Sequence, residues 1–324
     1  MKIDIVNKNV SWKSSENLVQ IFQITLKSDT KTKETFMNRP FFFQNQHQSL
    51  DTISQSIKKL TGTQIERQEA LYSLSLQREA IPDLAILLWE SPGTIASLLS
   101  EIISICPQIT SVAHGQSMNT PIHTKLVRRV CYTLTLFQTI AGNKETQLSF
   151  IHANIPMYLF PFLHTTNSSR ECECFKLTSL GIIGNLVKTE NAEIIDYLNQ
   201  NGFVPLCLRI LKFGQEISKL VSAFIIQKIL SNSNGRAFIS QQNERIETLL
   251  KVLNIIIFNL ASNFNPPLAL NIVLAYRYIL KIPKIEQIFQ KVTDIEKLKE
   301  IKLSEHCDHS SVSLFNTLLE LSHQ

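Results

Sequence analysis

The sequence predicts an all-α protein that folds as an armadillo-type right-handed helical solenoid of about six three-helix repeats. Long segments with apolar residues at helical spacing recur along the chain. Four matching residues near the ends of these segments, Ile140, Leu186, Ile229 and Ile279, are 46, 43 and 50 residues apart. Proline-led segments follow at matching places, and nine glycines are too few for a loop-rich β architecture. Three helices per unit at this period are typical of armadillo arrays, which leave a long concave surface.

The segment at residues 175–188 (FKLTSLGIIGNLVK) is the clearest of these helices. Its apolar residues recur at helical spacing, and Gly181 and Gly184 stand three apart inside it. A glycine inside a helix costs about 0.5–1 kcal/mol relative to alanine, so two of them indicate that something approaches closely. Tight packing against a neighbouring helix is one interpretation. A shallow groove, in which a partner lies over the glycine face, is the other.

The chain divides into three parts. Residues 1–48 do not follow the helical period and form an extension that carries a phenylalanine cluster, expected to fold back onto its own domain or to be poorly ordered. The armadillo-repeat domain spans residues 49–300. A tail at 301–324 contains a short amphipathic helix.

Within the repeat domain, prolines and caps place the helix ends. Proline is favoured at the first position of a helix because its missing N–H would have no partner there, so Pro82, Pro156 and Pro205 are expected to open helices. Thr94 is expected to cap a helix that ends at Ile103. The aperiodic residues 106–121 are expected to form a surface loop. The other helices are expected at 50–60, 65–76, 82–89, 129–141, 220–230, 246–260 and 270–280.

Composition narrows the function classes. A formal net charge of +5 permits contact with nucleic acid or acidic peptides without requiring it. The six cysteines are scattered, mostly inside apolar helices, as free thiols are in a reducing compartment. No apolar signal segment opens the chain and no run of about 18 apolar residues follows, so no membrane contact is expected. We expect a cytoplasmic protein with access to the nucleus.

Motifs for catalysis or cofactor binding do not occur. The sequence has no glycine-rich phosphate loop, H-E-x-x-H, G-x-S-x-G or C-x-x-C pair. Metal-ligand residue types cluster at 172–174 (CEC) and at 306–309 (HCDH). Adjacent residues on one short segment rarely all reach one ion, and a structural zinc site needs four ligands at looped spacing. We therefore predict no catalytic residues, no metal and no cofactor.

Basic residues suggest a second kind of surface. If the third helices of the repeats line the concave face, a basic stripe of Arg209, Lys212, Arg245 and Lys251 follows one groove. Such a stripe would bind single-stranded nucleic acid weakly, without sequence preference and in a salt-dependent way. A solvated face balanced by nearby glutamates is the alternative, and aromatic residues for base stacking are sparse there.

Several motifs resemble one family. In chain order they are 78–84 (REAIPDL), Trp89 with 93–96 (GTIA), 155–156 (IP) with 158–164 (YLFPFLH), 177–181 (LTSLG) and 204–210 (VPLCLRI). Together they resemble the required-for-cell-differentiation family, also called Caf-forty, the armadillo-repeat subunit of the CCR-NOT deadenylase complex. The resemblance runs from about residue 50 to about residue 298. It implies a non-catalytic adaptor in cytoplasmic mRNA decay and translational repression, present in P-bodies.

The resemblance implies two protein-binding surfaces. The helix after the W-x-x-x-G-T-I-A motif docks onto the large NOT scaffold subunit, and this surface carries over to Gly93, Thr94, Ala96 and Ile103. Small Ala96 would let a scaffold helix approach, and Ile103 would bury against it. A groove for short helical peptides of repressor proteins carries over to Cys174, Gly181 and Val221.

A third surface implied by the resemblance is a pair of pockets that capture tryptophans. Its residues carry over to Asn243, Arg245, Lys284 and Ile288. Only the arginine is retained, because Asn243 replaces a tyrosine, Lys284 an arginine and Ile288 a small alanine. An isoleucine side chain fills space that an indole needs, and an indole buries about 150–250 Å². Tryptophan capture is therefore predicted to be weak or lost.

The leading hypothesis is an adaptor that is held by a scaffold and presents binding surfaces to repressor or RNA-binding proteins. One alternative is an armadillo protein that binds nucleic acid through its basic concave groove. An unrelated enzyme on a helical scaffold is disfavoured because no catalytic motif occurs. A homodimer through the apolar face of the terminal repeats stays open.

Overall fold

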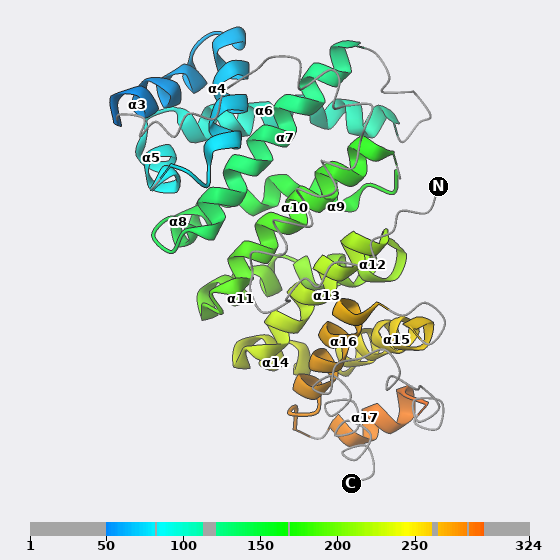
Figure 1. Cartoon of the computed structure of the whole chain (residues 1–324). Helices are drawn as coiled ribbons and strands as arrows, with labels where there is room; N and C mark the ends of the chain where they lie inside the picture. The colour runs from blue at the N-terminus through cyan, green and yellow to red at the C-terminus, as the bar shows by residue number, and fades with distance from the viewer. Residues whose placement is uncertain are drawn as a thin grey trace. The chain divides into compact units, whose positions relative to one another are not determined.

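The computed structural model describes residues 50–81, 83–112, 121–167, 169–260, 265–283 and 285–294. Every regular element in this part of the chain is a helix, and no strand occurs in it (Figure 1). The all-α class is therefore confirmed. The predicted extension at 1–48 and tail at 301–324 lie outside the described residues, so the domain boundaries stay predictions.

Apart from α3, η1 and α5 at the start of the described chain, the helices lie in three rows, and the central row has the closest packing between successive members. Figure 1 shows these members following one another diagonally across the view. They are α4 (Gln64–Gln77), α7 (Pro121–Gly142), α10 (Arg170–Lys188), α13 (Glu216–Ser231) and α16 (Pro266–Ile279). The predicted helices at 129–141, 175–188, 220–230 and 270–280 all lie within this row.

The two other rows flank the central one. The second row consists of α6 (Thr94–Val112), η2 (Ile155–Leu159) with α9 (Phe160–His164), α12 (Phe203–Phe213), α15 (Asn243–Leu260) and α17 (Ile285–Val292). The third row consists of α8 (Gln147–His152), α11 (Ala192–Gln200) and α14 (Ser233–Ser240). The first helices of the described chain are α3 (Leu50–Lys58), η1 (Lys59–Thr61) and α5 (Leu84–Glu90).

One helix from each row makes a repeat. The described residues contain four three-helix units, α5 to α7, α8 to α10, α11 to α13 and α14 to α16, with α3 and α4 before them and α17 after them. Each unit buries aliphatic side chains on its neighbours, as in the α10 residues Leu180, Ile183 and Leu186, which are fully buried. This stacking is how an armadillo array builds a continuous core.

Helix starts follow capping chemistry that is visible in the sequence. Side-chain oxygens of Ser169, Asn191, Asn232 and Asn265 accept hydrogen bonds from backbone N–H groups in the first turn of α10, α11, α14 and α16. Such caps satisfy N–H groups that have no partner inside the helix. Ser169 explains why α10 begins at Arg170, about one turn before the residue predicted from apolar spacing.

The prediction for α6 is wrong at its end. The helix does not stop at Ile103 but continues to Val112 with Pro107 inside it, so the first part of the predicted loop at 106–121 is helical. An interior proline costs about 3 kcal/mol. Ile102, Ile105 and Ile109 continue the helical spacing across the proline and are buried, which offsets that cost. Residues 113–120 lie outside the described part.

The capping prediction for Thr94 is also wrong. Thr94 is the first residue of α6, and the carbonyl oxygen of Gly93 accepts the hydrogen bond from the Ser97 N–H at 2.9 Å. Gly93 has φ +77°, in the left-handed region that favours glycine. The capping position therefore belongs to Gly93.

The two described prolines that were predicted to open helices, Pro156 and Pro205, lie in the first turn but not at the first position. Pro156 is the second residue of η2, which is a 3₁₀ helix, and Pro205 is the third residue of α12. The helix predicted at 82–89 begins at Leu84, and Pro82 lies outside the described residues. The first four N–H groups of an α-helix have no partner inside it, so a proline is tolerated at any of these positions.

No single helix among the described residues is long and apolar enough to cross a bilayer. The pair Leu84–Glu90 and Thr94–Pro107, bent by 91°, meets the length and composition criteria only when taken together.

Candidate functional site

The predicted scaffold-binding residues lie on and before α6, but they do not all face the same way. Ala96, Ser100 and Ile103 are exposed, and Ile103 is 49% exposed although it is a large apolar residue. Their spacing of four and three residues places them on one face of the helix. Thr94 is 1% exposed and therefore belongs to the core. We call the exposed residues Ala96, Ser100 and Ile103 the α6 face.

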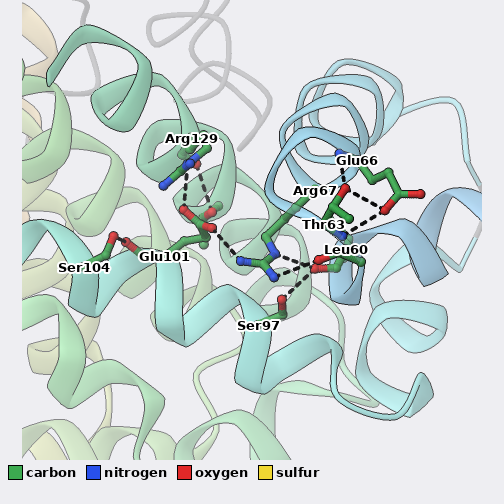
Figure 2. A network of polar contacts seen from close by, with 10 residues as sticks. Leu60, Thr63, Glu66, Arg67, Ser97, Glu101, Ser104 and Arg129 are labelled. Carbon is green, nitrogen blue, oxygen red and sulfur yellow. Dashed lines mark hydrogen bonds and ion pairs between the residues drawn. The ribbon is translucent and has the colours of Figure 1, made fainter. Parts of the chain in front are cut away.

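A buried carboxylate holds α6 from its inner side. Glu101, whose side chain is 4% exposed, lies between two arginines (Figure 2). Its Oε1 is 3.2 Å from Arg67 Nη1 of α4, and its Oε2 is 2.9 Å from Arg129 Nε of α7. A buried carboxylate needs such partners because desolvation otherwise disfavours its charged form. This ion triad fixes the rotation of α6 about its axis, and with it the direction of the α6 face.

Arg67 also joins α6 to the first described helices. Arg67 Nε donates to the carbonyl oxygen of Leu60 at 2.8 Å, and its Nη2 donates to that of Gly62 at 3.1 Å. Ser97 Oγ of α6 donates to the same Leu60 oxygen at 2.6 Å (Figure 2). Charged donors make stronger hydrogen bonds than neutral ones, so η1, α4 and α6 are held as one block.

The seam between α7 and α10 brings together two predicted groove residues and side chains that sequence reasoning missed. Cys131 Sγ lies 3.3 Å from Cys174 Sγ. A Cβ atom added at Gly181 would lie 2.8 Å from Gln138 Nε2, and one added at Gly142 would lie 3.1 Å from Asn185 Nδ2.

Each of these contacts joins residues 43 apart, not the 46 estimated from Ile140 and Leu186. Ile140 and Leu186 were matched by their apolar character alone. Their spacing of 46 residues differs from the observed register of 43 by about one helical turn. Along the seam, residues of α7 therefore meet the residues of α10 that lie 43 positions later in the sequence.

This seam shows which side chains lie against the two glycines in α10. The space over Gly181 holds the amide end of Gln138, and a Cβ on Gly184 would meet Phe224 of α13 at 4.0 Å, an ordinary contact distance. Both glycines therefore face side chains of neighbouring helices, as the packing interpretation predicts. A peptide lying over Gly181 would have to move Gln138.

The remaining predicted groove residue is on the next helix of the central row. Val221 of α13 is 4% exposed, so it presents little of its side chain to a partner. Cys174 and Gly181 are partly exposed and lie seven residues apart on one face of α10. The structure thus places all three in the central row, with the two α10 residues at the surface.

The predicted tryptophan-pocket residues lie at the end of the described chain. Arg245 Nη1 donates to the carbonyl oxygen of Phe238 at 2.9 Å, and the guanidinium carbon lies 4.0 Å from the centre of the Phe238 ring. Asn243 is exposed at the start of α15, and Ile288 is half-buried on α17, which packs on α15. Lys284 lies outside the described residues. The arginine that was expected to meet an indole is thus already stacked on a phenylalanine of this chain.

A polar contact that the sequence did not reveal fixes α17. Asn254 Nδ2 donates to the carbonyl oxygen of Val292 at 3.1 Å, and its Oδ1 accepts from the buried Tyr276 hydroxyl at 2.5 Å. Outside the core, Lys291 Nζ lies 2.9 Å from Glu247 Oε1. These bonds join α15, α16 and the end of α17.

The residues of the predicted basic stripe lie in the second row, on α12 and α15, and not in the central row with the groove residues. Arg209 donates to the carbonyl oxygen of His164, and Lys212 Nζ lies 4.9 Å from the centre of the Phe213 ring. Lys251 Nζ is 3.4 Å from Glu247 Oε2. Part of the basic charge is therefore balanced within the chain.

The metal-ligand clusters seen in the sequence do not gather into a metal site in the described part of the chain. There, no group of three or more histidine, cysteine, aspartate or glutamate side chains could hold a metal ion. In the 172–174 cluster, Cys172 is buried while Cys174 is partly exposed beside Cys131. The 306–309 cluster lies outside the described residues.

Comparison with known proteins identifies the family. Residues 56–322 match the cell differentiation family, Rcd1-like. The chain belongs to this family. The cell differentiation protein rcd1 of Schizosaccharomyces pombe is 38% identical over 232 residues, which cover 71% of this chain and 78% of that protein. Protein CAF40 of Saccharomyces cerevisiae is 39% identical over 201 residues, which cover 62% of this chain and 52% of that protein.

Solved structures support the fold of this Rcd1-like chain. A set of computationally designed armadillo repeat proteins for modular peptide recognition matches with a TM-score of 0.60 and 18% identity, covering 83% of this chain and 99% of that one. A designed armadillo repeat protein in complex with the peptide (KR)4 matches with a TM-score of 0.55, 18% identity and the same coverage. The armadillo prediction is confirmed.

Two features of the Rcd1-like chain could not be predicted from its sequence. Glu101 is the lone charge in an apolar helix, a pattern that signals a buried partner but does not say which one. Gln138 carries no signal of its own, because its role depends on the 43-residue register between α7 and α10. Both become visible only when neighbouring repeats are stacked.

Proposed function

We propose that this Rcd1-like protein is a non-catalytic, scaffold-bound adaptor subunit of the CCR-NOT deadenylase complex. In this role it recruits repressor or RNA-binding proteins for mRNA deadenylation, decay and translational repression. Membership of the family supports the proposal, and so does the armadillo fold, whose stacked helices present extended surfaces. We further propose that it works in the cytoplasm, including P-bodies, with access to the nucleus.

The observation that carries the proposal is the α6 face. Ile103 leaves about half of its side chain in water, while small Ala96 seven residues earlier leaves room for a second helix to approach. A partner helix that packs over Ala96 would remove the Ile103 side chain from water, which favours binding. The ion triad of Arg67, Glu101 and Arg129 holds this face in place before any partner arrives, which lowers the ordering cost of binding.

The first test is co-purification with the large NOT scaffold subunit from the same cells. An Ala96→Tyr variant places a bulky ring on the α6 face and should lose the scaffold subunit. Ala237→Tyr is the matched control, because Ala237 is also an exposed alanine inside a helix but lies on α14 of the third row. It should retain the scaffold. Equal recovery with wild type and Ala96→Tyr would overturn the proposed docking site.

For the partners that the adaptor recruits, we propose the central row around Cys174 and Gly181 as the site for short helical peptides. These two residues lie on one face of α10 and are partly exposed. Gln138 lies over Gly181, so a Gln138→Ala variant should bind a helical repressor peptide more tightly if the peptide occupies that place. Unchanged affinity in this variant, together with unchanged affinity in Gly181→Tyr, would exclude the site.

Capture of tryptophan by the α15 and α17 surface is expected to be weak. Ile288 is half-buried there, and the Arg245 guanidinium is stacked on Phe238. Replacing Ile288 with alanine should free space for an indole and raise affinity for a peptide with Gly-Trp repeats. Tight binding by the wild type that Ile288→Ala does not change would show that the isoleucine blocks nothing.

A further inference from the structure

Two cysteines that the proposed function does not use lie together in the α7/α10 seam. Cys131 of α7 and Cys174 of α10 are free thiols with their sulfur atoms 3.3 Å apart, and both are partly exposed. A disulfide bond is about 2.0 Å long, so the sulfurs need to approach by only about 1.3 Å more. Among the other described cysteines, Cys172 and Cys207 are buried and Cys106 lies on α6.

The surroundings make the two thiols unequal. The hydrogen bond between Cys131 and Cys174 lowers the pKa of the Cys174 thiol, and Thr178 and the positive charge of Arg170 lower it further, whereas desolvation and the negative charge of Glu171 raise it. The same hydrogen bond, followed by burial, raises the pKa of Cys131 well above its usual value. The thiolate is the reactive form of cysteine. Cys174 therefore has the character of an attacking sulfur and Cys131 that of a resolving thiol.

Other contacts along the seam keep α7 and α10 in register beside the pair. About two turns further along the same seam Gln138 fits over Gly181, and about three turns along Asn185 Nδ2 donates to the carbonyl oxygen of Gln138 at 2.9 Å. These contacts keep the 43-residue register between α7 and α10. Rotation about the side-chain torsions can bring the two sulfurs closer while these contacts hold the register.

We propose that Cys131 and Cys174 form a reversible disulfide when the protein is exposed to hydrogen peroxide. The Cys174 thiolate sulfur attacks one peroxide oxygen, so that an S–O bond forms, the O–O bond breaks and the leaving oxygen takes a proton to become water. The Cys131 sulfur then attacks Cys174 sulfur, the S–S bond forms, and the S–O bond breaks with release of a second water that carries the Cys131 proton. Two thiols and hydrogen peroxide give one disulfide and two waters, and a thiol reductant reverses the change.

The bond would join neighbouring repeats at the surface of the central row. Cys174 lies on the same face of α10 as Gly181, so oxidation changes the side chains presented on that face. Cytosolic disulfides are usually transient and redox-sensing, which fits a pair that is accessible and reducible. The proposal concerns the thiols alone and stands whether or not a peptide binds nearby.

Peptide mapping tests the proposal on the full-length protein. The reduced protein is treated with stoichiometric hydrogen peroxide, free thiols are alkylated, and the sample is digested with trypsin. Cleavage after Arg129 and Lys144 releases Cys131 in residues 130–144, and cleavage after Arg170 and Lys176 releases Cys174 in residues 171–176. We expect these two peptides to be joined, to lack two hydrogen atoms relative to their reduced sum, and to separate after reduction.

Variants assign the bond to its atoms. Residues 171–176 also contain Cys172, so the cross-link must persist in Cys172→Ala and disappear in Cys174→Ser. In Cys131→Ser, Cys174 should stop at the sulfenic acid, which a carbon nucleophile traps. Cys106→Ser is the matched control for a partly exposed thiol elsewhere and should leave the cross-link unchanged. Persistence of both free thiols in the wild type, or a cross-link to a different cysteine, would overturn the proposal without depending on any variant.

Discussion

At the scale of single residues, the seam between α7 and α10 shows how small side chains set the spacing of the repeats. Gly181 accommodates Gln138, and Gly142 accommodates Asn185, so each helix contributes one glycine and one amide to the seam. The sequence showed that something approaches α10 closely, because glycines inside a helix are unfavourable. It could not show what approaches, because Gln138 is 43 residues away.

Two glycines are expected to respond oppositely to alanine. In Gly181→Ala the new methyl group meets only the end of the flexible Gln138 side chain, so Gln138 turns aside and the helix gains stability of about 0.5 kcal/mol. In Gly235→Ala the methyl group would lie 1.9 Å from the backbone oxygen of Ile229, which cannot move, and about 2 kcal/mol or more of stability is lost. Urea unfolding of both variants measures the difference. Equal losses in the two would contradict this account of the seam.

At the scale of elements, the Glu101 ion triad is the strongest link between α4, α6 and α7. Glu101→Gln keeps the shape of the side chain but removes the charge between two arginines, and we expect a loss of about 2 kcal/mol in the free energy of unfolding. Glu69→Gln, at an exposed position of α4, is the control and should change stability by less than about 0.5 kcal/mol. Thermal or urea unfolding of both variants measures the change in the free energy of unfolding. A neutral Glu101→Gln would mean that packing alone orients α6.

The link between α15 and α17 predicts a pH dependence. Lys291, and to a lesser degree Lys251, lowers the pKa of the partly exposed Glu247 carboxyl below its ordinary value of 4.5. Because the pKa is lower in the folded state, this ion pair contributes stability above pH 4.5 that is lost as the pH falls through the folded-state pKa. In Lys291→Gln the pKa of Glu247 should return toward 4.5, as measured by NMR titration. Lys219→Gln, which removes the partner of Glu216, should leave it unchanged.

The elements also show how far the sequence can be interpreted. Apolar spacing located the helices of the central row, because buried faces must recur at about 3.6 residues. It failed at the end of α6, where buried isoleucines carry the helix past Pro107. Of the predicted scaffold residues, Ala96 and Ile103 are exposed and Thr94 is buried, since the rotation of α6 is set by Glu101 and its two arginines from other helices. Contacts between elements, rather than spacing within one, decided these points.

At the scale of all the described repeats, the proposed binding surfaces lie on different rows of helices. The α6 face belongs to the second row, whereas Cys174 and Gly181 belong to the central row. The two surfaces are on different helices and share no residue, so a partner on one leaves the residues of the other uncovered. Scaffold and peptide are therefore expected to bind at the same time, as an adaptor requires.

The central claim, that the α6 face docks onto the large NOT scaffold subunit, is tested most directly by hydrogen exchange of the purified chain with and without that subunit. The account predicts that protection on binding is concentrated in α6 around Ala96 to Ile103, and that Ala96→Tyr abolishes it. The central row should exchange as in the free protein. Protection confined to α10 and α13, or no protection by the scaffold at any concentration, would contradict the claim.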